Sequence, residues 1–504
     1  MTADSRDTSH LVPKLPEADQ HAATNDPNGV DSAVKHMFGR GSLYLVIWTL
    51  QIATNTAVGP LITRRLGPGH YGQVAAATSL MFVFSSLFNL GLQTAIQRTY
   101  ASRNGERTAL GLVTPSILIS FTFTGLTIAT CRWWAVYIGF GNDLSILRAA
   151  LLWSGLAAAT QPCFVLLRSQ DRIHIFAIAS IIQSLFAQAG GIALIIFYQP
   201  TAISYLSGMI LGEFAALLIL AIATKPPISG LFAFRETKAA LAFGIPLIPH
   251  LTALFVLTAG DRIVVLHDLG NTQVGRYQVT YNLASIGIVL LGAVITVWLP
   301  RLYAVNNDSD RWLVLAYTRN HVFHLLFPLT VGLSIGTTAV LHFYAPSSYK
   351  TAMLSSVAVT VALSSFPFAL YILNSQALLW AKRTPTLALC TTISAFANIV
   401  LNIILVPHLH IFGSALATLM SYSLLGGVVK MLVRRSVTLN TTPNSVWYAL
   451  IASSILSIST IAAPNSGIWL YVRLLAASAC GIFFLFSVRK IARPQAIQHA
   501  PIAI

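Results

Sequence analysis

Glu213 places a carboxyl group inside a long apolar stretch of the sequence, residues 202–224. A charge at the centre of a membrane costs about 2.5 kcal/mol or more, so a carboxylate at this depth is a candidate for function. It can take up a proton or Na⁺ and couple that uptake to transport, or it can pair with a basic neighbour. We treat Glu213 as the coupling-ion candidate and keep both interpretations open.

A set of polar side chains recurs every four residues and leads to an arginine: Ser85, Asn89, Gln93 and Gln97, followed by Arg98. On an ideal helix this spacing drifts by only about 40° per step, so the side chains stay on one face. Lipid cannot satisfy the hydrogen bonds of such a face. We therefore predict that Asn89, Gln93, Gln97 and Arg98 line a water-filled cavity.

Arg148, Arg262 and His250 complete the candidate substrate cavity. Both arginines lie near the outer ends of apolar segments, where their side chains can reach the membrane interface. Alternatively, they face the cavity, where the planar guanidinium suits a phosphate group. His250 follows Pro246 and Pro249, which interrupt a helix and free carbonyl groups; a hydrogen-bonded structural histidine is the other interpretation.

These side chains must be positioned by membrane helices. The chain has 504 residues, of which 55% are hydrophobic and only 9% charged, whereas about a quarter of the residues of soluble domains are charged. Apolar segments long enough to span a bilayer, about 20 residues each, recur along the chain and predict an all-α polytopic membrane protein with about fourteen transmembrane helices. We place them near 41–62, 73–96, 109–131, 145–167, 173–196, 202–224, 239–260, 277–299, 322–343, 352–379, 386–406, 411–430, 446–463 and 467–487.

Lys and Arg residues are concentrated in every second connection between these segments. The connections on one side of the membrane hold nineteen of them, and those on the other side hold seven. Because cytoplasmic loops collect Lys and Arg, both termini are expected in the cytoplasm. This placement also explains the net charge of +16 without nucleic acid. Residues 1–36 are polar and are expected to form a disordered cytoplasmic tail, and residues 491–504 a second cytoplasmic tail.

An internal repeat divides the chain into two halves. Arg65-Leu-Gly-Pro-Gly-His-Tyr71-Gly72 after the first segment is similar to Asp268-Leu-Gly-Asn-Thr-Gln-Val-Gly275 after the seventh. Repeated halves typically enclose a substrate path in alternating-access transporters. The expected domains are an N-lobe at 37–230 with helices 1–6, a C-lobe at 231–435 with helices 7–12, and two extra helices at 436–490.

Enzymatic chemistry is not indicated by this sequence. A membrane glycan polymerase or ligase would need carboxylates near its acceptor and a sizeable outer loop, and neither is present. The sequence Asp308-Ser-Asp310 follows Asn306 and Asn307 and is typical of a solvated turn. No catalytic residue, cofactor or metal site is predicted; the four cysteines lie in or beside apolar segments without a C-x-x-C pair.

The segment from Asn398 to Ser421 carries the most specific pattern. Asn398 and Asn402 share a helix face, and after Pro407 the small residues Gly413, Ala417 and Ser421 recur at the spacing of close helix packing. Packing within a helix bundle accounts for both features, and the asparagines can also face a water-filled cavity.

With the turns at 64–72 and 269–277, this segment resembles bacterial polysaccharide flippases of the multidrug/oligosaccharidyl-lipid/polysaccharide exporter superfamily. The resemblance covers residues 36–490. It implies two six-helix lobes in a V-shaped bundle, often followed by two extra helices, in the bacterial plasma membrane.

The resemblance also implies a function: translocation of undecaprenyl-pyrophosphate-linked oligosaccharide repeat units for surface polysaccharide biosynthesis. The expected partners are this lipid-linked substrate and the bilayer, together with glycan polymerase and co-polymerase proteins; nucleic acid is not expected. A multidrug or cation-coupled exporter of the same superfamily is the alternative.

Overall fold

The computed structural model describes residues 27–103, 105–141, 143–303, 305, 307–435 and 443–492. Met1–Trp48 and Thr49–Ile504 form separate units, and the second contains every side chain discussed below. Of the expected tails, residues 1–26 and 493–504 lie outside the described residues, and residues 491–492 belong to a helix that ends at Ala492. Residues 27–36, expected in the tail, belong to a helix that begins at Pro27, since proline is favoured in the first helical turn.

All regular elements of the described residues are helices, and no strand occurs among them. Short 3₁₀ or π-helical turns join several of the α-helices, for example at Ile182–Phe186 and Ile245–Leu247. The α-helices are α1 (Pro27–Asn89), α2 (Leu92–Tyr100), α3 (Gly105–Trp134), α4 (Leu144–Ser169), α5 (Ile173–Ile181), α6 (Ala187–Phe197), α7 (Ala202–Thr224), α8 (Phe234–Gly244), α9 (Ile248–Phe255), α10 (Asp261–Leu269), α11 (Asn271–Ala284), α12 (Ile286–Tyr303), α13 (Asp308–Tyr344), α14 (Ser355–Leu363), α15 (Ser365–Trp380), α16 (Thr384–Arg434), α17 (Asn444–Ala462) and α18 (Ile468–Ala492).

The helices confirm an all-α polytopic membrane protein. Eleven helical stretches within the described residues are long and apolar enough to cross a membrane, and all fourteen expected segments fall on helices. The two counts differ by three. Both α1 and α16 run through two expected spans, α16 with a break at His410 (φ 54°), and no stretch of the eleven covers the expected span 277–299. The segments 41–62 and 277–299 lie on α1 and on α11 with α12. The lobe boundaries at 230 and 435 stay predictions.

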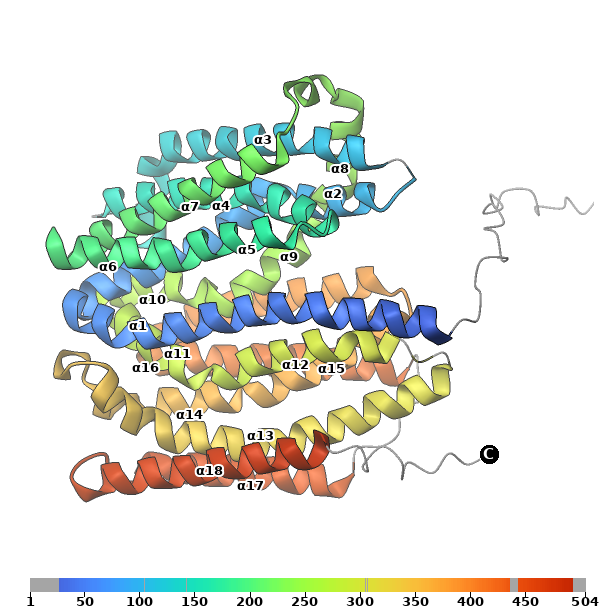
Figure 1. The fold of residues 1–504 in the computed structure, drawn as a ribbon. Coiled ribbons are helices and arrows are strands. Elements are labelled where there is room, and N and C mark those ends of the chain that lie inside the picture. The colour runs from blue at the N-terminus through green and yellow to red at the C-terminus, as the bar shows by residue number, and fades with distance from the viewer. Residues whose placement is uncertain are drawn as a thin grey trace, which may run out of the picture. The chain divides into compact units, whose positions relative to one another are not determined.

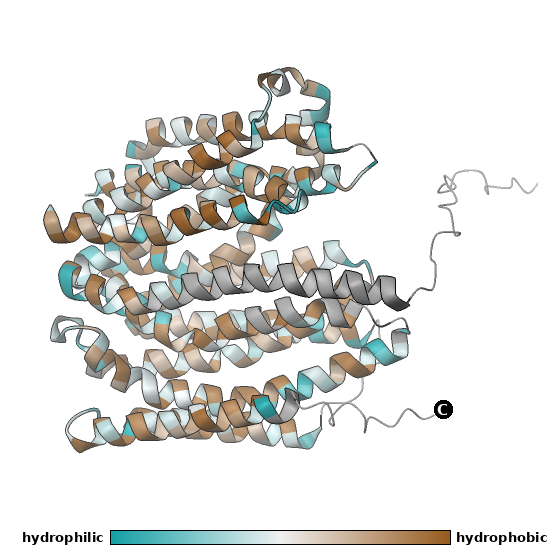
Figure 2. Cartoon of the chain, viewed as in Figure 1, coloured by the Kyte–Doolittle hydropathy of each residue, from teal (hydrophilic) through white to brown (hydrophobic). Residues whose placement is uncertain are grey.

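Figure 2 shows hydrophobic residues along the lengths of the helices, with hydrophilic residues gathered at helix ends and turns. Large apolar side chains on α18 are exposed, among them Leu475 (71%) and Phe486 (66%). Such surfaces are stable against lipid tails. Both α17 and α18 pack against α13 (Figure 1), so the two expected extra helices cover one flank of the second half.

The two repeated turns share one backbone conformation. Gly67 has φ 66° and ψ 175°, and Gly270 has φ 80° and ψ 174°. Positive φ at both sites favours glycine over every other residue. The repeat seen in the sequence is therefore also a repeat in structure, because each turn breaks its helix in the same way.

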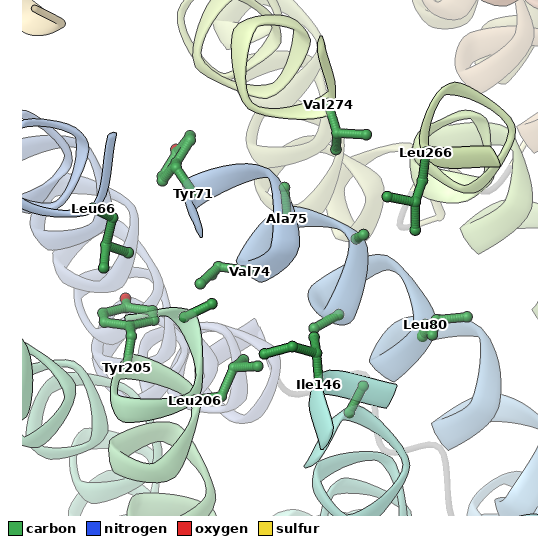
Figure 3. Close-up of a cluster of buried hydrophobic side chains, with 14 of the residues drawn as sticks. Leu66, Tyr71, Val74, Ala75, Leu80, Ile146, Tyr205, Leu206, Leu266 and Val274 are labelled. Atoms are coloured by element: carbon green, nitrogen blue, oxygen red, sulfur yellow. The ribbon is translucent and has the colours of Figure 1, made fainter. Parts of the chain in front are cut away.

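A cluster of buried side chains joins helices from both halves of the sequence. Its side chains include residues of α1, α4 and α7 from the first half and of α10, α11 and α13 from the second. Figure 3 labels Leu66, Tyr71, Val74, Ala75, Leu80, Ile146, Tyr205, Leu206, Leu266 and Val274 in this cluster. Dispersion contacts of this kind stabilise helix association within a bilayer, and here they hold the repeated turns in place.

Candidate functional site

The two halves meet where residues 61–98 pack against residues 243–282, a contact surface that we call the seam. At one end, the turn end, the repeated turns touch. A Cβ on Gly72 would overlap the backbone carbonyl of Asn271, and a Cβ on Gly275 would overlap that of Pro68. Only glycine permits this approach at the two positions, so the related turns lie backbone against backbone.

Asp143, which immediately precedes α4, ties the two turns together. Its Oδ2 accepts hydrogen bonds from Gln73 Nε2 and Asn271 Nδ2, both at 3.0 Å. Hydrogen bonds to a charged group contribute about 1.5–3 kcal/mol each. Sequence reasoning missed Asp143 because its partners lie 70 and 128 residues away along the chain.

Residues of α11, of the end of α13 and of the loop after it also contact the turn end. Asn282 Nδ2 donates to the Tyr71 hydroxyl at 3.1 Å, and the Tyr71 ring meets that of Tyr349 edge-on, with centroids 6.2 Å apart. Thr63 Oγ1 donates to the carbonyl oxygen of Tyr344 at 3.0 Å. These neutral hydrogen bonds add to those of Asp143 in connecting the halves at this end.

The middle of the seam is formed by aromatic and hydroxyl side chains. The Phe82 and Phe255 rings stack with centroids 5.6 Å apart, and the hydroxyl groups of Ser86 and Thr252 are 3.4 Å apart. These side chains come from α1 and α9, the helices that are expected to be the second and seventh spans. The halves are therefore in contact well beyond the turn end.

At the other end, the break end, two helices are interrupted at facing positions. Leu90 (φ 50°) and Gly91 (φ 71°) separate α1 from α2, and the 3₁₀ turn Ile245–Leu247 follows Gly244. A Cβ on Gly91 would lie 2.5 Å from the carbonyl oxygen of Gly244. The halves again touch backbone against backbone.

The helix break at Leu90 and Gly91 separates the polar residues expected on one face. Asn89 is buried at 2% exposure, donates to the Ala158 carbonyl at 3.2 Å and accepts from the Gln93 amide at 2.9 Å. Gln93 is half-buried, whereas Gln97 and Arg98 are exposed. The Arg98 guanidinium lies 4.5 Å from the ring centre of Phe243 in the opposite half. The two exposed residues, Gln97 and Arg98, therefore lie at the break end of the seam.

Glu213 is buried at 4% exposure in α7. Its Oε1 lies 2.9 Å from Thr160 Oγ1 in α4 and 2.7 Å from Gln183 Nε2 in the π-helical turn Ile182–Phe186. In the described part of the chain no basic side chain forms an ion pair with it. The coupling role of Glu213 stays a prediction, and its hydrogen-bonding partners are neutral.

Thr160 gives the Glu213 carboxyl two hydrogen-bonding arrangements. Its hydroxyl lies 2.9 Å from both the Ala157 carbonyl oxygen and Glu213 Oε1, and it has one hydrogen to donate. When that hydrogen points to Glu213, Thr160 donates to a charged carboxylate; when it points to Ala157, a protonated Glu213 can donate to Thr160. The Thr160 hydroxyl can therefore hydrogen-bond to Glu213 in either protonation state.

Arg262 belongs to a buried polar network in the second half. Its Nη1 lies 2.6 Å from Asp261 Oδ1, and both side chains are at most 4% exposed. Its Nε donates to Gln278 Oε1 at 2.9 Å, and its guanidinium lies 4.1 Å from the ring centre of Tyr281. The Tyr277 hydroxyl donates to Asp261 Oδ2 at 2.6 Å, which satisfies the second carboxylate oxygen.

The segment Asn398–Ser421 closes over this network. Asn402 Nδ2 donates to the Asn398 carbonyl at 2.9 Å, and both asparagines are at most 1% exposed. Ser414 and Thr418 hydroxyl groups point to Asp261 Oδ2 at 3.3 and 3.5 Å. The motif thus packs within the bundle, and its link to Asp261 was not visible from sequence because 153 residues separate Ser414 from Asp261.

The two remaining candidates lie apart from each other. Arg148 is exposed on α4. His250 is half-buried, and its Nδ1 lies 2.7 Å from Thr391 Oγ1. Among the described residues, no group of three or more His, Cys, Asp or Glu side chains is arranged to hold a metal ion. Whether the candidate residues face a common cavity stays a prediction.

Comparisons with known proteins agree with this architecture. Residues 61–354 match the family described as "Polysaccharide biosynthesis protein". The chain is 19% identical to the probable low-salt glycan biosynthesis flippase Agl15 of Haloferax volcanii over 398 residues, which is 77% of this chain and 79% of that protein. It is 24% identical to the Lsg locus putative protein 1 of Haemophilus influenzae over 48% of this chain and 60% of that protein.

Solved structures show the same fold. A lipid II flippase MurJ in an inward closed conformation superposes with a TM-score of 0.64 and 17% identity, over 89% of this chain and all of that one. An inward-facing multidrug resistance MATE transporter of the MOP superfamily gives 0.56 and 14%, over 76% and 94%. The family resemblance expected from the sequence is thereby confirmed: the chain belongs to the polysaccharide biosynthesis protein family and shares the fold of these two transporters.

Proposed function

We propose that this protein moves undecaprenyl-pyrophosphate-linked oligosaccharide repeat units across the bacterial plasma membrane for surface polysaccharide biosynthesis. The family match over residues 61–354 and the likeness to a glycan biosynthesis flippase support this substrate class. In this proposal both termini lie in the cytoplasm, and a glycan polymerase and co-polymerase receive the translocated unit.

The seam is the structural observation that carries the proposed mechanism. Its two ends close through glycine backbones, at Gly72 with Gly275 and at Gly91 with Gly244. The turn end is also joined by the two hydrogen bonds of Asp143 and by neutral hydrogen bonds worth about 0.5–1.5 kcal/mol each. Contacts of this strength can form and separate in turn. Opening one end while the other stays closed would expose a cavity alternately to each side of the membrane.

The polar part of the substrate needs cations within that cavity. Arg98 and Arg148 are the candidate arginines with exposed side chains, and the guanidinium fork suits a pyrophosphate oxygen pair. Gln97 is exposed beside Arg98 and offers hydrogen bonds to sugar hydroxyl groups. Four other candidates would then position the cavity wall by holding the neighbours that they contact: Asn89, Gln93, His250 and Arg262. The polyprenyl chain remains in the bilayer.

Glu213 would couple transport to protons. The carboxyl has neutral partners and a Thr160 hydroxyl that can serve its charged or its protonated form. Proton uptake would change the hydrogen bonds that join α4, the π-helical turn and α7.

A cation-coupled multidrug exporter is the second candidate function, because Glu213 is a buried carboxyl in a fold shared with a MATE transporter. Deleting the gene separates the two. Accumulation of complete lipid-linked repeat units, measured by mass spectrometry, with loss of surface polymer supports the flippase. An unchanged lipid pool with increased drug sensitivity supports the exporter.

A further inference from the structure

A groove with a volume of about 370 Å³ lies between α13, α14 and α15, the second part of α16, and α17. Apolar side chains form most of its wall, including Phe323, Phe366, Leu370, Leu419, Leu450 and Ile458. It borders the expected extra helices and is separate from the seam. None of the candidate cavity residues lines it.

One end of the groove is strongly basic. Arg319 and Lys430 line it, and Arg434 is close enough to both for the three positive charges to repel one another. Lys430 Nζ also lies 4.8 Å from the ring centre of Trp447. Among the described residues that line the groove, none is acidic, so this end favours an anion.

The groove is open along its length. Trp447 is 44% exposed and Ile458 is 55% exposed, and both line it from α17. The rise of a helix places these two residues about 17 Å apart, which is close to the roughly 15 Å of hydrocarbon in one leaflet. Its basic end belongs to the side that the Lys and Arg distribution assigns to the cytoplasm, where anionic headgroups attract basic residues.

We propose that this groove binds one anionic glycerophospholipid of the inner leaflet. Lys430 and Arg319 hold the phosphate, with Arg434 beside them, and one acyl chain lies along α17 towards Ile458. The anion offsets the mutual repulsion of the three cations, which a lipid without net charge does not do. The occupant touches α13, α16 and α17 at once, so it fastens the first extra helix to the second half.

Native mass spectrometry of the full-length protein tests this inference without any transport assay, so its outcome is independent of the proposed function. The probes are phosphatidylglycerol, phosphatidylcholine with the same acyl chains, and undecaprenyl phosphate. The variants are Lys430→Gln, which removes one charge, and Ser454→Phe, which fills the groove at a residue lining it. Lys238→Gln, an exposed lysine on the same expected side, is the matched control.

The inference predicts one saturable phosphatidylglycerol per protein, bound more tightly than phosphatidylcholine. Lys430→Gln should weaken binding about fivefold, as expected for one basic residue near a lipid surface, Ser454→Phe should abolish it, and Lys238→Gln should leave it unchanged. Equal binding of both phospholipids, or insensitivity to Lys430→Gln and Ser454→Phe, overturns the inference. Two further results would overturn it. One is preferential binding of undecaprenyl phosphate that Lys430→Gln and Ser454→Phe weaken, and the other is a second copy of the chain filling the groove.

Discussion

Gly244 and Gly91 close the break end of the seam backbone against backbone. A Cβ on Gly244 would lie 2.5 Å from the carbonyl oxygen of Leu90 and 3.0 Å from the carbonyl carbon of Gly91. Both facing helices are interrupted here, by Leu90 and Gly91 on one side and by Ile245–Leu247 on the other. A contact between two interrupted helices can separate without bending an intact helix, as alternating access requires.

Gly244→Ala should hold the break end open. The added methyl group meets backbone atoms that cannot move aside, and overpacking of this kind costs about 1–3 kcal/mol. Disulfide formation between cysteines introduced at Ser86 and Thr252, whose hydroxyl groups are 3.4 Å apart, should fall about fivefold or more. Gly125→Ala is the control, since nothing lies within 4 Å of a Cβ there. Unchanged cross-linking in Gly244→Ala would show that this contact does not govern closure.

Asp143→Ala should loosen the turn end. The change removes the acceptor for Gln73 and Asn271, and its half-exposed position reduces the expected loss to about 1–2 kcal/mol. Amide hydrogen exchange in residues 68–75 and 271–276 should become roughly tenfold faster. Asp268→Ala, an exposed acid near the same turn, should change little. Equal acceleration by both variants would exclude a specific role for the Asp143 hydrogen bonds.

Glu213→Gln should leave the protein folded and remove proton coupling. A glutamine amide can still hydrogen-bond to Thr160 and Gln183, but it cannot take up a proton. Transport by the variant in proteoliposomes should no longer respond to an imposed pH gradient. Glu236→Gln, at an exposed position at the start of α8, should respond like the unmodified protein. Retained gradient dependence in Glu213→Gln would move the coupling site elsewhere.

Tyr277→Phe should destabilise the second half. It leaves Asp261 Oδ2 without its 2.6 Å hydrogen bond, and a lost bond to a buried charge costs about 1.5–3 kcal/mol. Unfolding in mixed detergent micelles measures this change, and Tyr448→Phe, at 68% exposure, should stay within about 0.5 kcal/mol. Equal stability of the two variants would mean that the Tyr277 hydroxyl does not stabilise the Asp261 network.

The sequence predicted the helices well because spans of apolar residues are dictated by the thickness of the bilayer. It also located the repeated turns, since Gly67 and Gly270 need a positive φ that few residues adopt. The prediction that the polar side chains at four-residue spacing share one face was less accurate. It assumed one continuous helix, whereas the helix breaks at Leu90 and Gly91, so that Asn89 is buried in the bundle and Gln97 is exposed.

The polar networks were beyond prediction from one sequence because they form between distant segments. Asp143 joins two turns, and Asp261 collects hydroxyl groups from Tyr277, Ser414 and Thr418. Hydropathy and helical spacing contain no information about such contacts. Glu213 was detected because a carboxyl in an apolar segment is conspicuous, but its neutral partners Thr160 and Gln183 were not.

The central claim is that the protein flips a lipid-linked oligosaccharide. The most direct measurement reconstitutes the purified protein in liposomes that contain a fluorescent undecaprenyl-pyrophosphate-linked oligosaccharide and follows how much of it an added glycosidase can reach. We expect accessibility to rise from the outer-leaflet fraction towards completion, and Gly244→Ala to slow that rise. Accessibility that remains at the outer-leaflet fraction, in liposomes with an imposed proton gradient as well as without one, would contradict the proposed function.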